Sequence, residues 1–120
     1  VEGVYHDADR CGELTQALLE LPEPPTCILL PDDFSAIGGL SAIQKMGLRV
    51  PEDVSVTGYD GIHLASVMHP RLTTYYQDTD ILGKTAAAKL IELIEKPRTA
   101  LLDRTIISGT LQEGQSVRRL

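Results

Sequence analysis

The sequence has few of the residues that would place it in a membrane or in a disulfide-stapled class. It contains no tryptophan and one phenylalanine, so its core must be mainly aliphatic. No apolar run approaches the ~20 residues of a membrane span, and no signal peptide is visible, so we expect no membrane association. The two cysteines form no CxxC or Cys/His spacing, which fits a reducing cytoplasm. We interpret Cys27 as a buried strand residue and Cys11 as a small helix residue.

Positive charge is also scarce. The chain contains 11 basic and 17 acidic residues, which gives a net charge of -6. An acidic surface repels phosphate backbones, so this segment is a poor candidate for touching DNA itself. The chain is 42% hydrophobic and 23% charged, as expected for one globular domain. Because its first residue is Val1 rather than Met, we expect it to have been cut from a longer protein or processed.

The groups that usually carry out catalysis are not arranged for it. The histidines His6, His63 and His69 show no metal-ligand spacing, and no Ser or Cys lies in a nucleophile elbow. No glycine-rich phosphate loop is present, and Gly38-Gly39 falls inside a helical pattern where small residues permit close packing. We therefore predict no enzymatic activity, no metal and no cofactor.

The most informative stretch is Thr26–Asp60, which contains two short apolar runs that both end in acidic residues. The runs are Cys27–Leu30 and Val54–Thr57, and the residues between them repeat apolar side chains at helical spacing. Gly47 can end that helix in the left-handed conformation, with Leu48 folding back on the last turn. Strand, helix and strand in about 35 residues indicate a βαβ unit with parallel strands.

Three carboxylates follow these two strands. Asp32 and Asp33 come after the first strand and Asp60 after the second. Parallel strands place them at the same edge of the sheet, where open α/β sheets bind ligands, so we expect them within reach of one crevice. Three simpler or different roles remain open: a helix cap for Asp32 or Asp33, a turn residue for Asp60, and a magnesium site for all three.

The rest of the chain continues the alternation of strands and helices, which predicts an α/β protein with a parallel sheet. Gly12, inside the first helix, is expected to mark close packing. The expected elements are a strand over Val1–Tyr5, a helix capped by Asp9 and running to Leu21, one helical turn over Leu64–Met68, a strand over Arg71–Gln77, a helix over Ile81–Glu95 capped by Asp78 or Thr79, and strands over Arg104–Ser108 and Thr110–Glu113.

These residues resemble a known family. The run PTCILLPDDFSAIGGLSAIQKMGLRVPEDVSVTGYDGI, the later P-x-LTT with Gln77, and LGKTAAAKLIELI are similar to the effector-binding core of lactose-repressor-type (LacI/GalR) transcription regulators. The resemblance covers about Pro25 to Glu113. It implies a lobe of the periplasmic-binding-protein-like (type I) fold, present here as a truncated fragment.

The resemblance also implies how the chain divides. Residues 1–76 correspond to the carboxyl-terminal lobe of the effector-binding core. Residues 77–103 correspond to a crossover and to a helix of the other lobe, whose strands are absent, and residues 104–120 return to the carboxyl-terminal lobe. That helix is expected to dock on a neighbouring chain or to repack on the sheet of the fragment itself.

Ligand-binding residues follow from the same resemblance. Asp60 matches the acid that holds ligand hydroxyl groups. Asp32 stands where the family usually has Asn, which implies an effector that offers more donors. Asp7-Ala8 matches an acid followed by an aromatic ring that stacks on the sugar, and since Ala8 is not aromatic, that platform is missing.

Further residues match the crossover and the subunit contact of the family. Gln77 and Thr79 match the crossover segment beside the ligand, and Ile37, Leu40 and Met68 match the dimer interface. The implied protein is a cytoplasmic, homodimeric transcriptional repressor. It senses a small, carbohydrate-like effector and contacts DNA only through an N-terminal helix-turn-helix that this chain lacks.

Two other functions are compatible with parts of the pattern. A solute-binding protein of a sugar transporter has the same fold, and a helix-turn-helix upstream would decide against it. A magnesium-dependent phosphoryl-transfer or receiver domain could use the three acids. However, Asp33 and Asp60 are separated by one βα unit rather than two, and Lys84 falls inside a helix where a lysine after a strand is needed.

Overall fold

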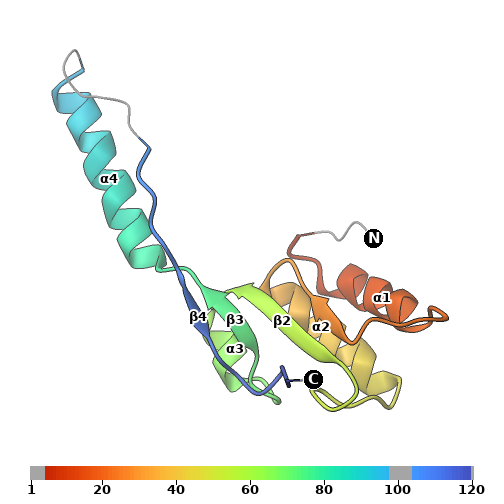
Figure 1. Cartoon of the computed structure of the whole chain (residues 1–120). Helices are drawn as coiled ribbons and strands as arrows, with labels where there is room; N and C mark the ends of the chain where they lie inside the picture. Colours follow the sequence, from red (N-terminus) through yellow and green to blue (C-terminus); the bar gives the residue numbers. More distant parts are fainter. Residues whose placement is uncertain (1–4, 98–103, 120) are drawn as a thin grey trace. The chain divides into compact units, whose positions relative to one another are not determined.

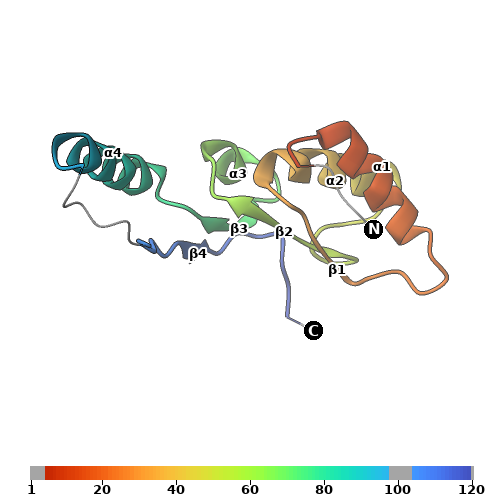
Figure 2. The same cartoon turned by 90° about the horizontal axis from the view of Figure 1, so that it is seen from above.

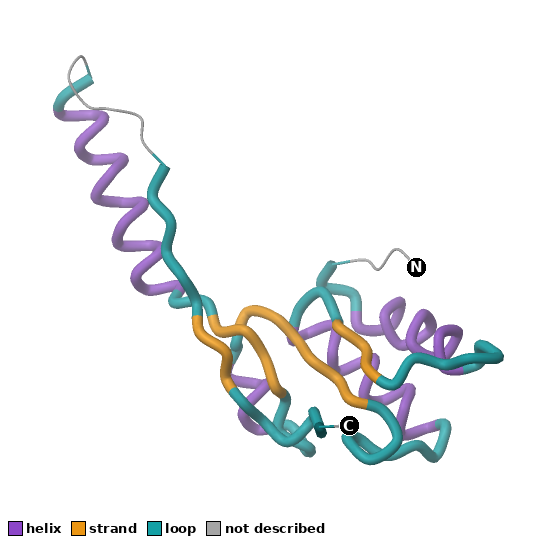
Figure 3. The backbone as a smooth tube through the Cα atoms, in the orientation of Figure 1, coloured by secondary structure: helices purple, strands orange, loops and turns teal. Residues whose placement is uncertain are grey.

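The structure, a computed structural model, describes residues 5–97 and 104–119. Strands and helices alternate through most of the described chain (Figures 1 and 3). Two compact units are present, the first formed by Val1–Tyr76 with Leu111–Leu120 and the second by Gln77–Thr110. The elements are α1 (Ala8–Leu19), β1 (Cys27–Leu29), α2 (Asp33–Lys45), β2 (Ser55–Asp60), α3 (His63–Val67), β3 (Thr73–Tyr76), α4 (Thr79–Glu95) and β4 (Thr110–Gln112).

The strands form one sheet in the order β1-β2-β3-β4, in which β1 pairs with β2 and β2 with β3 in parallel. Cys27 lies opposite Ser55, and Asp60 lies opposite Tyr76. The predicted βαβ unit and the α/β fold class are therefore confirmed. Within the first unit, α1, α2 and α3 lie on one face of the sheet (Figure 2).

The core lies between those helices and the sheet, and it is aliphatic, as the absence of tryptophan and the single phenylalanine predict. Ile28, Val56 and Ile43 are among its buried members. Side chains alternate across a strand, so the neighbours of Ile28 point to the opposite face. Leu29 is 78% exposed there, and Cys27 is exposed as well. The prediction that Cys27 is buried was wrong because the described helices cover only one face.

Helices α1 and α2 cross at glycines. A Cβ on Gly38 would lie 1.6 Å from the carbonyl oxygen of Ala8, and one on Gly12 would lie 3.1 Å from the carbonyl oxygen of Gly38. Such separations leave no room for a side chain at Gly38. The predicted packing role of both glycines is confirmed.

The helix ends follow local capping chemistry. Asp7 rather than the predicted Asp9 caps α1, because its side chain accepts the Arg10 N–H, and the helix ends at Leu19. At the end of α2, Gly47 has φ +74° and the Leu48 N–H donates to the carbonyl oxygen of Ile43. This confirms the predicted glycine-terminated end of α2, which satisfies carbonyl groups that would otherwise have no partner.

The second unit and the chain end depart in part from the predicted elements. Helix α4 begins after its cap Asp78 and has no buried residue. No strand forms over Arg104–Ser108, which has no ladder partner among the described residues, whereas Thr110–Gln112 pairs as predicted. Of the strand predicted over Val1–Tyr5, residues 1–4 lie outside the described residues, and Tyr5 is in a turn. No helix in the described part of the chain is long and apolar enough to cross a membrane.

Candidate functional site

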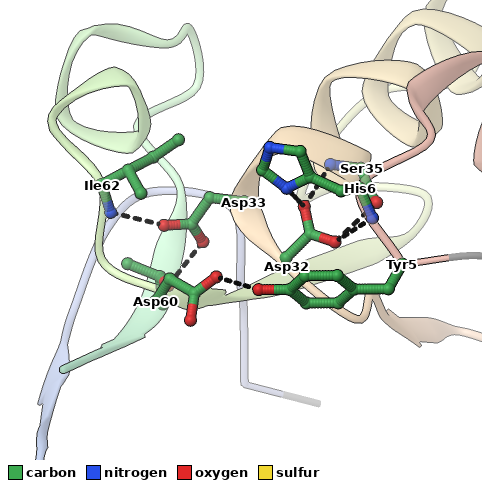
Figure 4. Close-up of polar contacts among 8 residues, drawn as sticks. Tyr5, His6, Asp32, Asp33, Ser35, Asp60 and Ile62 are labelled. Carbon is green, nitrogen blue, oxygen red and sulfur yellow. Dashed lines mark hydrogen bonds and ion pairs between the residues drawn. The ribbon is translucent and has the colours of Figure 1, made fainter.

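The candidate site lies at the carboxyl end of the two strands that carry the acidic residues. Asp60 is the last residue of β2, and Asp32 follows β1 and precedes α2. Two consecutive residues connect them: the Tyr5 hydroxyl donates to Asp60 Oδ2 at 3.1 Å, and the His6 N–H donates to Asp32 Oδ2 at 2.8 Å (Figure 4). The structure therefore brings Asp32 and Asp60 to one edge, joined by the turn that precedes α1.

Asp32 is the N-cap of α2 and is fully buried. Its Oδ1 accepts the Ser35 N–H at 2.7 Å, and its Oδ2 accepts the Ser35 hydroxyl at 2.8 Å as well as the His6 N–H. Burial alone would raise the pKa of Asp32, but these hydrogen bonds outweigh it and hold the pKa below its usual value. The cap role that the sequence left open is confirmed. Both carboxylate oxygens of Asp32 already accept hydrogen bonds from the protein, and direct contact with a ligand stays a prediction.

Three aromatic rings lie beside these carboxylates. The Tyr5 and His6 rings stack at a centroid distance of 5.6 Å, and the His6 and Phe34 rings stack at 4.7 Å. Tyr5 is 62% exposed and Phe34 is 39% exposed, so the rings offer an open apolar surface. The sequence reasoning missed this ring group (Tyr5, His6 and Phe34), although each member lies within two residues of a predicted site acid.

Asp7 and Ala8, by contrast, are engaged in forming α1. Asp7 caps the helix and Ala8 is its first residue, with its carbonyl against Gly38. Ala8 supplies no ring, as expected, and the rings beside the carboxylates are those of Tyr5, His6 and Phe34. A role of Asp7 and Ala8 in ligand contact stays a prediction.

Gln77 and Thr79 belong to the second unit. The Thr79 N–H donates to the Gln77 carbonyl oxygen at 2.9 Å, and Asp78 caps α4 through the Ile81 N–H. These hydrogen bonds satisfy the N–H groups of Thr79 and Ile81 at the start of α4. The prediction that Gln77 and Thr79 border the ligand stays a prediction.

Asp33, the neighbour of Asp32, is also fully buried. The Thr74 hydroxyl donates to its Oδ1 at 2.6 Å, and the Ile62 N–H donates to its Oδ2 at 2.8 Å. Burial raises the pKa of Asp33, and the hydrogen bonds from Thr74, Ile62 and Gly61 offset only part of that effect. Among the described residues, no group of three or more His, Cys, Asp or Glu side chains could hold a metal ion.

The residues matched to the dimer interface lie together on a different surface. Ile37, Leu40 and Met68 line one groove with a volume of about 490 Å³. Leu48, Val50 and Pro70 add further apolar lining. An open groove of this kind suits a partner surface, and the interface stays a prediction.

Known proteins share this sequence and fold. The family model for the periplasmic binding protein-like domain matches residues 2–117. The probable HTH-type transcriptional repressor ExuR of Bacillus subtilis (strain 168) is 37% identical over 120 residues, which are the whole of this chain and 35% of that protein. The chain therefore spans about a third of the length of this relative.

Solved structures agree with the sequence comparison. A LacI family transcriptional regulator from Arthrobacter sp. FB24, in complex with lactose, matches with a TM-score of 0.80 and 32% identity, over 92% of this chain and 42% of that one. The Lac repressor dimer bound to operator and the anti-inducer ONPF matches with a TM-score of 0.86 and 31% identity, over 97% and 40%. These relatives are transcriptional regulators, not enzymes. The chain belongs to the periplasmic binding protein-like domain family, in the form found in the effector-binding core of LacI-type repressors.

Proposed function

We propose that this chain is the effector-sensing and dimerising part of a cytoplasmic, DNA-binding transcriptional repressor. The DNA-binding part and the other half of the effector site lie in the remainder of the protein. Asp60 accepts hydrogen bonds from hydroxyl groups of a small polar effector, and the ring group of Tyr5, His6 and Phe34 packs against its apolar face. Asp7, Ala8, Gln77 and Thr79 complete the proposed surroundings of the effector.

The observation that carries this proposal is the contact between Tyr5 and Asp60. A phenol hydroxyl already donates to Asp60 Oδ2 at 3.1 Å, in an exposed position. A carboxylate offers about four lone-pair positions, so a ligand hydroxyl can add to this donor or replace it. The nearby ring faces favour a ligand that is polar at its edge and apolar on its face, as a carbohydrate is.

Lactose, found with one of the two structural relatives, supports a carbohydrate-like effector. In a two-lobed site, such a ligand favours the closed arrangement of the lobes because it contacts both of them. Its differential affinity for the two arrangements then shifts the population between DNA-binding and non-binding states.

Isothermal titration calorimetry of the full-length protein tests the proposal, after a thermal-shift screen of sugars and nucleosides that includes lactose and ribose. We expect Asp60→Ala to abolish effector binding while the protein stays folded. Glu23→Ala is the control, because Glu23 is an exposed acid in the loop before β1, whereas the candidate site lies after that strand. Unchanged affinity in Asp60→Ala would remove Asp60 from the site.

A further inference from the structure

We propose that Asp33 is the positioning residue for Asp60: its buried carboxylate holds the backbone just after Asp60 and so fixes the direction of the Asp60 side chain. This inference rests on the proposed function, in which Asp60 contacts the effector. Asp33 itself is fully buried, so its proposed role is exerted through Asp60.

The contacts of Asp33 reach the strand beside Asp60 and the loop that follows Asp60. From the start of α2, its carboxylate accepts the Thr74 hydroxyl of β3 at 2.6 Å. It also accepts the Ile62 N–H of the loop after β2 at 2.8 Å (Figure 4). Hydrogen bonds to a charged acceptor are stronger than those between neutral groups. One side chain thus ties together α2, β3 and the loop that follows Asp60.

The Asp33 carboxylate is packed tightly against the end of β2. A Cβ on Gly58, two residues before Asp60, would lie 2.2 Å from Asp33 Oδ1. The end of β2 therefore passes directly against the Asp33 carboxylate, and any larger residue at position 58 would displace it. Asp33 contacts the chain on both sides of Asp60.

Asp60 needs such support because its backbone is unfavourable. Its φ is 98°, in a region that residues with a side chain rarely adopt. Conformations of this kind persist only where the surrounding structure holds them. The hydrogen bond from Ile62 to Asp33 lies two residues beyond this position, where it prevents the loop from relaxing.

Two variants of the full-length protein test the proposal. Asp33→Asn keeps the size of the side chain but removes its charge and one acceptor oxygen. Thr74→Val keeps the shape of the residue and removes one donor to Asp33. Thr57→Val is the matched control: Thr57 is also a β2–β3 ladder residue, and its buried hydroxyl has no hydrogen-bond partner among the described residues.

The first readout is hydrogen exchange of the Ile62 amide. The second is an NMR titration of the Tyr5 phenol in protein labelled at the tyrosine ring carbon, with the signal assigned by Tyr5→Phe. The hydrogen bond to Asp60 raises the pKa of Tyr5, and Asp32 adds to the effect, so this pKa reports where the Asp60 carboxylate lies. If Asp33 only stabilises the fold, its substitution lowers the melting temperature but leaves the pKa of Tyr5 in the folded protein unchanged.

In Asp33→Asn we expect Ile62 to exchange about tenfold faster or more, as loss of one charged hydrogen bond implies, and the Tyr5 pKa to fall toward its ordinary value. If Asp33→Asn does not fold, Thr74→Val decides alone, with the same two shifts expected. The proposal is overturned if both quantities match the wild type, or if Thr57→Val changes them equally.

These readouts need no effector, so they separate this inference from the proposed function. Asp60→Ala that still binds effector would defeat the proposed function while leaving the exchange and titration results intact. Unchanged exchange and titration would defeat the positioning role even where Asp60→Ala abolishes binding.

Discussion

The adjacent carboxylates of Asp32 and Asp33 are both buried, but their pKa values are shifted in opposite directions. The pKa of Asp32 is lowered because its hydrogen bonds outweigh the cost of burial, whereas burial dominates at Asp33 and raises its pKa. The charged form of Asp32 therefore stabilises the folded state. The charged form of Asp33, in contrast, lowers the free energy of unfolding because its burial is not fully offset by hydrogen bonds.

Replacing Asp32 tests the first of these statements. We expect Asp32→Ala to lower the free energy of unfolding by about 1–2 kcal/mol at pH 7, through loss of the N-cap. Because the folded-state pKa is lowered, this contribution is present above the ordinary pKa and is lost as the pH falls through the lowered value. Urea unfolding at pH 7 and at pH 3 should show a smaller difference between wild type and variant at pH 3, and a constant or growing difference would contradict it.

The cap of α2 was predictable from sequence, since Asp before an apolar helical pattern is a strong local signal. The ring group was not. Tyr5 and His6 lie in a turn in which His6 has φ 62°, so no periodicity marks them. The stacking of His6 on Phe34, and of Tyr5 on His6, depends on how α1 and α2 pack. Local chemistry therefore predicts helix ends, whereas the site surface depends on contacts between distant segments.

At the scale of elements, the crossing of α1 and α2 depends on the absence of a side chain at Gly38. We expect Gly38→Ala to lower the free energy of unfolding by about 1–3 kcal/mol, because the added methyl group overlaps the Ala8 carbonyl. Gly83→Ala is the control, since a Cβ there meets nothing within 4 Å and lies within α4. Thermal unfolding should show the control unchanged or more stable, by up to ~1 kcal/mol. Equal effects at both positions would contradict the packing argument.

The positions of three strands could be predicted from the sequence, but the exposure of their outer face could not. β1 and β2 form where short apolar runs predict them, and β3 forms where threonine and tyrosine favour extended structure. The parallel order follows from the helices between the strands. The exposure of Cys27 was not predictable, because the period of two says which residues share a face but not whether anything covers it. Arg104–Ser108 has strand propensity but no ladder partner among the described residues, so it forms no strand.

At the level of the full protein, the chain corresponds to one part of its relatives. It spans 35% of the length of the B. subtilis relative. Helix α4 has no buried residue, and Leu90, Ile91 and Ile94 on it are exposed. Apolar surface of this extent favours burial elsewhere, and we expect the remainder of the protein to cover α4.

The groove formed by Ile37, Leu40 and Met68 gives the dimer proposal a direct test. We expect Ile37→Asp in the full-length protein to raise the dimer dissociation constant about 100-fold or more, because the interface would bury an unpaired charge. Leu21→Asp, at an exposed position outside the groove, is the control. Sedimentation equilibrium measures both. A dimer of unchanged affinity in Ile37→Asp would place the interface elsewhere.

In the proposed function, Asp60 and the ring group hold the effector. The crystal structure of the full-length protein with the effector found by the thermal-shift screen tests it most directly. We predict an effector hydroxyl within hydrogen-bond distance of Asp60, about 2.5–3.0 Å, and a face of the effector against Tyr5 or His6. An effector bound with no contact to Asp60 or to these rings would contradict the account.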